Sequence, residues 1–415
     1  MEQQWDMIVV GGGLAGLAAG VTAAAGGAET LVLEAEALGG RARTHAEQGF
    51  VFNLGAHALY LGGPGWRVLS ELGARVAGRK PPLARYQARL GGELHALPTG
   101  PGTLLRTTLL GTRGKAQLGR LLARLPHIDA SMLTAISVRE WLDDLDLRDD
   151  VRALVGSLVR IATYSGELEQ LSAGAVIRQL QAASRDGVLY VDGGFSSIVA
   201  ELERKVQVRP GTRALALAPG RGSIELHTDE GRLVGRRVIL APGAPAPTLA
   251  LLPGDPGWGD LGGPVIAACL DVGVDMVPAP GYVLGIDEPL YATTQSPPAR
   301  QAPAGAAVVA VLRYGGSDRS RDELAAYLRH AGVTESHVVV QRFLPRMVVA
   351  SAMPRADNGG LPGRPSVRAS GLEGVFLAGD WVGPDGLLAD AALASGHQAG
   401  LAALQSLDRL AGMVA

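Results

Sequence analysis

Residues 7–34 decide the fold, and they read MIVVGGGLAGLAAGVTAAAGGAETLVLE. The apolar run at 7–10 predicts a buried strand, the small residues at 14–25 predict a helix, and the run at 30–34 predicts a second strand. The turn between the first strand and the helix has the spacing G-x-G-x-x-G, with glycines at Gly11, Gly13 and Gly16. In this strand–turn–helix–strand context, the spacing predicts a dinucleotide-binding unit.

Each glycine of this turn has its own physical role. Gly11 permits the tight turn, Gly13 lets the backbone approach a pyrophosphate, and Gly16 lets the helix lie close to the strand. The first helical residues, Leu14 and Ala15, offer free N–H groups and the positive end of the helix dipole to the phosphates. A glycine-rich turn in an unrelated α/β protein is the alternative, but it does not explain the two flanking strands.

Glu34 ends the second strand where such units place a carboxylate that accepts hydrogen bonds from ribose hydroxyls, and Ala35 follows it. The next block, LGGRART at 38–44, combines two glycines with two arginines. Together, the fingerprint, the acid and this G-G-R-x-x-[ST] block resemble the N-terminal signature of the flavin amine oxidase, protoporphyrinogen oxidase and phytoene desaturase superfamily. The chain is most similar to phytoene desaturase-like members, and the resemblance implies that the dinucleotide is FAD.

By this resemblance, Arg41 and Arg43 lie near the FAD pyrophosphate, and Gly40 keeps the backbone close to it. A guanidinium suits a phosphate in both charge and geometry. A second block, FNLGAHALY at 52–60, is similar to the loop that passes the flavin ring in phytoene desaturase-like members. The strand that ends in LAGD at 377–380 resembles a motif whose Asp bonds the ribityl or pyrophosphate part of FAD.

The same resemblance implies further contacts with FAD. Backbone before the later strands is expected to meet the adenine, and the first N–H groups of the last helix are expected to face the flavin. The implied residues are Leu54, Gly55, Ala56, His57, Arg213, Ala214, Ala241, Gly379, Asp380, Leu387, Leu388 and Ala389.

The sequence predicts an α/β fold in which a three-layer, Rossmann-type FAD-binding domain carries an inserted α+β substrate domain. The resemblance covers 1–80, 190–250 and 346–415, so we expect the FAD-binding domain to be discontinuous. We expect the substrate domain at 81–189 and 251–345. Leucines at three- and four-residue spacing predict helices in the first insertion, and short apolar runs predict an antiparallel sheet in the second.

Composition limits the classes of function. A length of 415 residues suggests two or three folding units. The net charge is −2 and no dense basic stripe is visible, so we expect no nucleic-acid partner. Cys269 is the only cysteine and the histidines lack metal-ligand spacing, so we expect neither an internal disulfide nor a metal site. We expect a cytoplasmic protein without a transmembrane segment, in which membrane association would be peripheral only.

His57 and Tyr164 are the candidate catalytic side chains. His57 lies in the block expected beside the flavin, and a histidine that merely packs on the cofactor is the alternative. Tyr164 follows the helical insertion, where aromatic packing is the alternative role. No lysine occurs after Lys205, which disfavours the lysine-held water that amine oxidases of the superfamily often use. Because no second dinucleotide fingerprint is visible, dioxygen or a quinone is the expected electron acceptor.

The leading hypothesis is FAD-dependent dehydrogenation (desaturation) of an apolar or weakly polar small molecule, by hydride transfer to flavin N5. Three alternatives stay open at this point. The first is an amine or amino-acid oxidase that releases peroxide, the second is a non-redox flavoenzyme such as a mutase or isomerase, and the third is a flavin-binding protein without catalysis.

Overall fold

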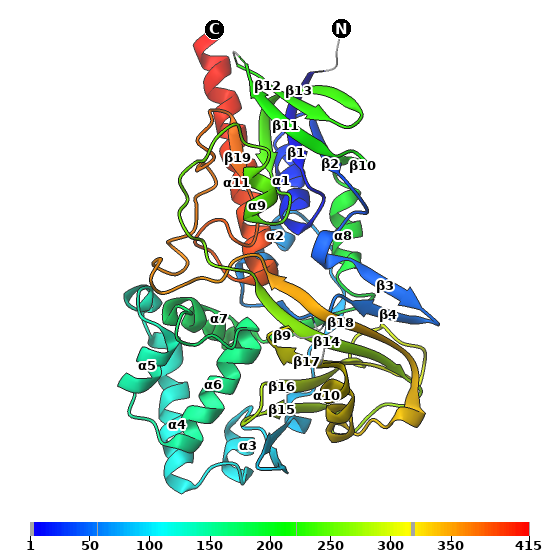
Figure 1. The fold of residues 1–415 in the computed structure, drawn as a ribbon, viewed down its shortest axis with the longest axis vertical. Coiled ribbons are helices and arrows are strands. Elements are labelled where there is room, and N and C mark those ends of the chain that lie inside the picture. Colours follow the sequence, from blue (N-terminus) through cyan, green and yellow to red (C-terminus); the bar gives the residue numbers. More distant parts are fainter. Residues whose placement is uncertain (1–3, 56, 221, 317–319, 415) are drawn as a thin grey trace.

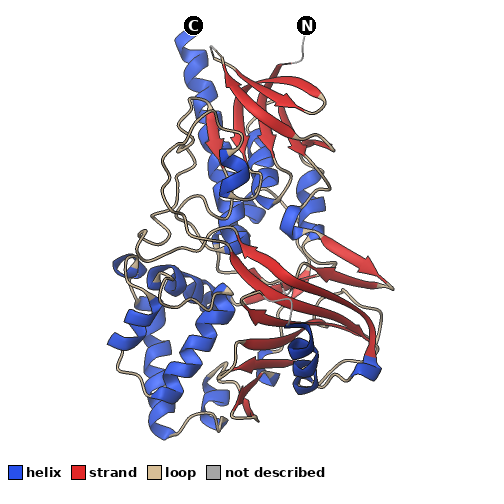
Figure 2. Ribbon diagram, viewed as in Figure 1, coloured by secondary structure: helices blue, strands red, loops and turns tan. Residues whose placement is uncertain are grey.

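The structure is a computed structural model that describes residues 4–55, 57–220, 222–316 and 320–414 (Figure 1). Two seven-stranded sheets organise the chain, one in the upper half and one in the lower half of Figure 2, and helices pack on both. The predicted fold class is confirmed, because a Rossmann-type α/β unit is joined to a second unit of helices and sheet.

The first sheet contains the strands predicted around the glycine turn. Its spatial order is β10 (Gln207–Pro210), β2 (Thr30–Glu34), β1 (Gln4–Val10), β13 (Gly231–Leu240), β12 (Ile224–Thr228) and β11 (Ala214–Pro219), and β19 (Val375–Leu377) pairs with β13. β10, β2, β1, β13 and β19 run parallel to their neighbours in this set. Residues 7–10 are buried, which explains their unbroken apolar run in a sheet covered on both faces.

Helices cover one face of this sheet. The crossover helix α1 (Leu14–Ala25) packs against α11 (Leu388–Val414) and α8 (Ser196–Glu203) in one apolar cluster. The opposite face carries a second cluster that includes Ile8, Leu31, Leu251 and Trp381, supplied by the sheet, by the turn after α9 (Pro245–Leu249) and by long loops. The sheet is therefore the middle layer of three.

The second sheet has the spatial order β18 (Val338–Ala350), β14 (Val265–Val274), β17 (Ala307–Tyr314), β16 (Leu290–Ser296), β15 (Tyr282–Gly285), β7 (Gln87–Leu90) and β8 (Glu93–Ala96). The expectation of a wholly antiparallel sheet from the second insertion is wrong at one edge. There β7, which belongs to the first insertion, lies parallel to β15. The hairpin β7–β8 reaches the edge from a distant part of the chain, so no tight turn fixes its direction relative to β15.

Helices cover both faces of the second sheet. One face carries α3 (Pro101–Arg106), α4 (Thr112–Arg124), α5 (Val138–Asp144), α6 (Asp149–Thr163) and α7 (Ala173–Asp186), and the other carries α10 (Ser320–Tyr327). Successive residues of β14 point to opposite faces, so Cys269 packs toward the helical layer and Leu270 toward α10. Alternation along one strand thus builds two separate cores.

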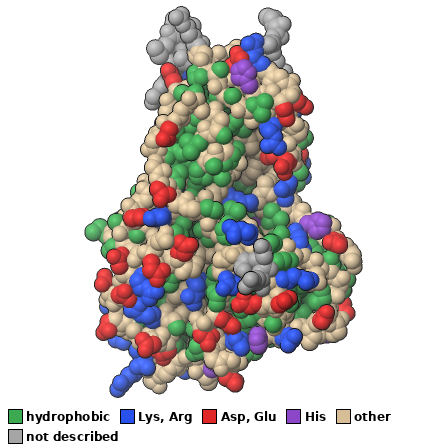
Figure 3. Space-filling model, viewed as in Figure 1, with side chains coloured by type: hydrophobic (Ala, Val, Ile, Leu, Met, Phe, Trp, Pro, Cys, Tyr) green, Lys and Arg blue, Asp and Glu red, His purple; other side chains and the backbone are tan. Residues whose placement is uncertain are grey.

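Shorter elements complete the chain. They are the hairpin β3 (Thr44–Glu47) and β4 (Phe50–Asn53), the strands β5 (Leu59–Tyr60), β6 (Gly78–Arg79) and β9 (Val188–Val191), the helix α2 (Pro64–Glu71), and 3-10 turns at Gly40–Ala42, Leu83–Arg85, Leu125–His127, Ala130–Leu133, Leu328–Ala331 and Glu335–His337. Within the described ranges, none of the helices has the length and apolarity to cross a bilayer. On the face shown in Figure 3, cationic and anionic side chains are interspersed over the lower half.

Candidate active site

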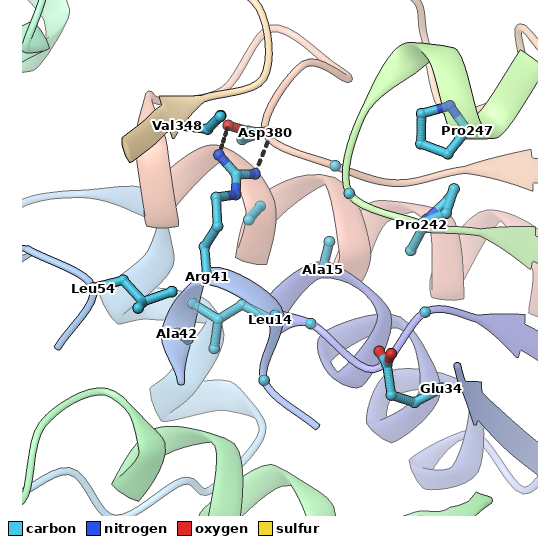
Figure 4. Close-up of a pocket in the computed structure, with 18 of the residues that line it drawn as sticks. Leu14, Ala15, Glu34, Arg41, Ala42, Leu54, Pro242, Pro247, Val348 and Asp380 are labelled. Carbon is cyan, nitrogen blue, oxygen red and sulfur yellow. Dashed lines mark hydrogen bonds and ion pairs between the residues drawn. The ribbon is translucent and has the colours of Figure 1, made fainter. Parts of the chain in front are cut away.

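A cavity of about 840 Å³ lies at the carboxyl ends of β1, β2, β13 and β19, where they approach β18 of the second sheet. Ligand sites of open parallel sheets form at this edge, and the volume is within the range of about 300–1,000 Å³ that ligand pockets span. Figure 4 shows Glu34 toward one end of the cavity, Leu54 toward the other, and Arg41 with Asp380 between them. The cavity is therefore elongated, as a dinucleotide requires.

The glycine turn forms the floor of this cavity. Gly11 has φ +106°, and a Cβ there would lie 2.2 Å from the carbonyl oxygen of Ala241. A Cβ at Gly16 would lie 1.8 Å from the carbonyl oxygen of Gly11, so this glycine lets α1 approach the strand. At Gly13 a Cβ would meet no atom of the described residues within 4 Å, because the position faces open space. The backbone at the start of α1 is thus open to a ligand.

Glu34 is already fixed by the backbone around it. Its Oε2 accepts a hydrogen bond from the amide of Gly12 at 2.8 Å, and its Oε1 accepts one from the amide of Glu36 at 2.9 Å. Arg213 and Leu215 belong to the same region of the cavity wall. The carboxylate retains lone pairs that face the cavity edge, as the ribose hydroxyls of a bound dinucleotide would require.

Arg41 and Asp380 form the polar centre of the cavity. Arg41 Nη1 donates to Asp380 Oδ2 at 2.8 Å, and Arg41 Nη2 lies 2.8 Å from Asp380 Oδ1 (Figure 4). The amide of Ser351 also donates to Oδ2, at 2.9 Å. Burial alone would raise the pKa of Asp380, but the charge and hydrogen bonds of Arg41 and the Ser351 amide hold it below its usual value. Asp380 is therefore an ionised acceptor in a buried place.

Most residues that the sequence singled out line this one cavity. They are Gly11, Gly13, Leu14, Ala15, Glu34, Ala35, Gly40, Arg41, Leu54, His57, Tyr164, Arg213, Ala214, Ala241, Gly379, Asp380, Leu388 and Ala389. Positions from the two ends of the chain and from its middle thus meet around a single space.

A few expected residues lie outside the cavity wall. Gly16 packs behind Gly11, and the side chain of Arg43 is 41% exposed and lies 3.7 Å from Glu36. Gly55 packs under Met347. Leu387 is buried in a small apolar cluster with Ala175 and Leu361. Ala56 lies outside the described residues.

Backbone carbonyls hold the imidazole of His57. Its Nδ1 lies 3.0 Å from the carbonyl oxygen of Gly55, the ring also hydrogen-bonds the backbone of Arg41, and Phe195 packs edge-on at a centroid distance of 4.8 Å. Burial lowers the pKa of His57, the two backbone hydrogen bonds oppose this shift, and the charges of Arg41 and Arg342 add to it. The neutral ring has one N–H and therefore donates to one carbonyl at a time, and this engagement by backbone favours a positioning role over proton transfer.

Tyr164 ends α6 with φ +59°, a left-handed conformation that is unusual for a residue with a side chain. This turn lets its ring reach the cavity wall, where the hydroxyl of Tyr291 donates to its hydroxyl at 3.0 Å. Burial raises the pKa of Tyr164, so the phenol stays protonated. Tyr164 is therefore a neutral polar group in the wall.

Sequence reasoning missed the contribution of β18. Residues 344–349 of this strand line the cavity opposite the glycine turn, and the backbone carbonyl of Val349 accepts from Arg41 Nη1 at 3.2 Å. The strand has no motif, and its place follows only from pairing with β14 through several register shifts. Tyr60, which ends the 52–60 block, also lines the cavity and was not among the expected site residues.

The residues present fit FAD. An elongated cavity combines an open backbone at Gly13, a ribose-type carboxylate at Glu34, and a cation–carboxylate pair midway along it. Within the described ranges, no group of three or more His, Cys, Asp or Glu side chains is placed to hold a metal ion.

Comparisons with known proteins agree with this geometry. Residues 14–256 match the family model described as flavin containing amine oxidoreductase. No curated protein sequence matches the chain. An oxidoreductase from Methanosarcina mazei is 17% identical, with a TM-score of 0.72 over 95% of this chain and 99% of that one.

Two other solved structures share the fold. Cyclohexylamine oxidase from Brevibacterium oxydans IH-35A is 15% identical, with a TM-score of 0.73 over 98% of this chain and 100% of that one. A triple mutant of putrescine oxidase is 16% identical, with a TM-score of 0.75 over 98% of this chain and 99% of that one. At these identities the likeness concerns the fold.

Proposed function

Because this chain belongs to the flavin-containing amine oxidoreductase family and is an FAD-dependent oxidoreductase, we propose that it dehydrogenates (desaturates) an uncharged, apolar or weakly polar small molecule. The family defines the cofactor and the class of enzyme. The substrate class is our inference from the cavity wall.

The observation that carries this proposal is the wall at the Leu54 end of the cavity. Most of its side chains are apolar, aromatic or phenolic, namely Leu54, Tyr60, Tyr164, Phe195, Leu344, Met347, Val349 and Leu388, and His57 and Arg346 also line the cavity. Such a wall removes apolar substrate surface from water, and its polar partners for substrate include the neutral hydroxyls of Tyr60 and Tyr164.

The charges of the cavity support an uncharged substrate. Among the described lining residues, the carboxylates are Glu34, Glu36 and Asp380. Glu34 accepts from the backbone at the ribose end, and Asp380 is already paired with Arg41. A cationic amine at the Leu54 end would lose its hydration without gaining an anionic partner, which is costly in a buried place.

The residues of the chain have defined tasks in such a reaction. FAD, when bound, supplies the two-electron acceptor. The apolar wall excludes water and orients the C–H bond that breaks, and orientation alone accounts for a large share of rate enhancement in such reactions. Tyr60 and Tyr164 stay protonated, since burial raises the pKa of Tyr60 to about 12 and that of Tyr164 further, so they donate hydrogen bonds rather than accept protons.

Two further features support this reading. The N-terminal blocks resemble those of phytoene desaturase-like members, and no lysine follows Lys205. We propose dioxygen or a quinone as the electron acceptor, because the sequence has a single dinucleotide fingerprint. Peripheral contact with a membrane would suit an apolar substrate.

Anaerobic mixing tests the proposal. The FAD-loaded protein is mixed without oxygen with polyenes, porphyrinogens and cyclic hydrocarbons in one series, and with primary amines and amino acids in another. We expect loss of the oxidised-flavin absorbance with a member of the first series. Reduction by amines alone, with peroxide release on admitting air, would instead establish an amine oxidase. A product isomeric with its substrate, formed without net electron transfer, would establish a mutase or isomerase.

A further inference from the structure

Asp390 is a buried carboxylate beside the cavity, and the function above does not use it. It lies in the first turn of α11, directly after Leu388 and Ala389, which line the cavity. Only 2% of its surface is exposed. Its Oδ1 accepts a hydrogen bond from the amide of Gly65 at 3.0 Å, and among the residues that the structure describes its Oδ2 has no hydrogen-bond partner.

The pocket around Asp390 is shaped for this side chain. A Cβ at Gly63 would lie 2.0 Å from Oδ2, and a Cβ at Gly65 would lie 2.5 Å from Oδ1. Gly63 caps α2 and offers no side-chain hydrogen bond. Asp390 therefore supplies, from another helix, the carboxylate that a helix N-terminus favours. The contact ties the first turn of α11 to α2.

Charged and titratable groups approach Asp390 from the neighbouring elements. Arg67 of α2 attracts its negative form, and Tyr60 of β5 lies close enough to feel its charge. The side chain of Gln179 on α7 also faces the hydroxyl of Tyr60 and lowers the pKa of that tyrosine. Arg364 donates to the carbonyl of Gly386, next to Asp390, at 3.0 Å. Burial outweighs the Gly65 amide and Arg67 and raises the pKa of Asp390 to about 7.

The position of Asp390 makes its charge matter to the cavity. The free N–H groups at the start of α11 create a positive end that faces the cavity at Leu388 and Ala389. An ionised carboxylate in the same turn offsets this positive end, whereas a protonated one does not. Reduction of a flavin at physiological pH adds negative charge, which the positive end stabilises.

We propose that Asp390 is a positioning residue whose protonation sets the electrostatic potential of the cavity-facing turn of α11, and that it thereby couples proton uptake to reduction of the bound FAD. The proposal rests on FAD binding but not on the substrate proposed above, so each can fail without the other. It assigns to Asp390 no contact with substrate.

A redox titration of the bound FAD over a series of pH values tests the coupling. The holoprotein and Asp390→Asn are compared, since Asn keeps an oxygen acceptor for the Gly65 amide and removes the charge. Well below neutral pH the two proteins should hold the same reduced fraction at a given applied potential. Well above it, Asp390→Asn should hold at least about a threefold larger ratio of reduced to oxidised FAD, because only the native carboxylate is then ionised.

Two further variants separate this effect from a structural one. Asp408→Asn removes an exposed carboxylate from the same helix and should follow the native protein at every pH. Arg67→Gln removes the cation that faces Asp390. In a plot of the ratio of reduced to oxidised FAD against pH, the bend that marks ionisation of Asp390 should therefore lie at a higher pH than in the native protein. If Asp390→Asn does not fold, the shift of this bend in Arg67→Gln still tests the proposal. A gap between Asp390→Asn and the native protein that stays constant with pH, or a bend that Arg67→Gln leaves in place, would overturn the proposal.

Discussion

Arg41 and Asp380 lie 339 positions apart in the sequence, yet they form a two-point ion pair with N···O distances of 2.8 Å in the middle of the cavity. The pair joins the glycine-rich N-terminal block to the strand that precedes the last helix. Asp380 is buried, whereas the side chain of Arg41 is 36% exposed. The pair thus holds these two segments of the first unit together at the FAD site, and part of the Arg41 guanidinium group remains exposed.

The first prediction concerns this pair. Asp380→Ala should lower the free energy of unfolding by about 2–3 kcal/mol, less than the roughly 3–5 kcal/mol of a fully buried pair because Arg41 is partly solvated. The pKa of Asp380 is lowered in the folded chain, so its stabilisation is present above about pH 4 and is lost as the pH falls through the folded value. Denaturant unfolding at neutral and acidic pH measures both effects.

Arg43→Ala is the matched control for that experiment. Arg43 belongs to the same block, but its side chain is exposed and lies 3.7 Å from Glu36. Its loss should cost less than about 0.5 kcal/mol. If the two variants lowered the free energy of unfolding equally, the Arg41–Asp380 pair would contribute no more to stability than the exposed Arg43 side chain.

A second prediction separates the two functions of glycine in the turn. Gly13→Ala places a methyl group in open space, so the melting temperature without cofactor should stay the same while the affinity for FAD falls about tenfold or more. Gly16→Ala places its methyl group 1.8 Å from the carbonyl oxygen of Gly11, so this variant should be strongly destabilised. Thermal melts and FAD titrations measure the two outcomes. An unchanged FAD affinity in Gly13→Ala would mean that no ligand approaches this backbone.

The third prediction concerns Glu34. Glu34→Gln removes the negative charge and keeps one oxygen acceptor, so one of the two backbone amides, that of Gly12 or that of Glu36, also loses its hydrogen bond. The variant should bind FAD and ADP about tenfold to a hundredfold more weakly, which corresponds to the roughly 1.5–3 kcal/mol of a hydrogen bond to a charged group. Binding of riboflavin, which lacks the adenosine ribose, should be unaffected. Competition titrations give the comparison, and a matching loss for riboflavin would contradict the assignment of Glu34 to the ribose.

A fourth prediction concerns His57. His57→Ala should retain FAD but lose about tenfold to a hundredfold in the rate of substrate-dependent flavin reduction, since displacement of the loop misplaces the substrate. His45→Ala is the control, because His45 is an exposed histidine beside Glu47 in the hairpin β3–β4. Stopped-flow reduction measures the rate. An unchanged rate in His57→Ala would remove this side chain from the mechanism.

His57 also makes stability depend on pH. Its pKa is lowered by burial in the folded chain, so the unfolded chain binds the proton more tightly. The free energy of unfolding should therefore fall as the pH drops below about 6.5, the ordinary histidine value, and this part of the fall should vanish in His57→Ala.

The nucleotide end of the cavity was predictable because its geometry is local. The turn at Gly11 and the carboxylate of Glu34 belong to one short strand–helix–strand unit, whose spacing reflects direct backbone contacts. The direction of Arg43 was not predictable in this way. Arg41 lies within the 3-10 turn at Gly40–Ala42 and Arg43 follows that turn, and of these two arginines only Arg41 reaches the cavity.

The substrate end depends on contacts between distant segments. The β18 wall at 344–349 follows from the register of a long irregular strand, and no local motif encodes that register. Asp390 stands out in the sequence as a carboxylate in an apolar helix. Its partner Gly65, 325 positions away, is visible only in the folded chain.

The most direct measurement is a titration of the cofactor-free, folded chain with FAD, followed by its visible absorbance and by competition with ADP. We expect saturation at one FAD per chain and displacement by ADP, because the cavity between Glu34 and Leu54 is built for a dinucleotide. A chain that is folded by circular dichroism and takes up no FAD would contradict the whole account of this cavity.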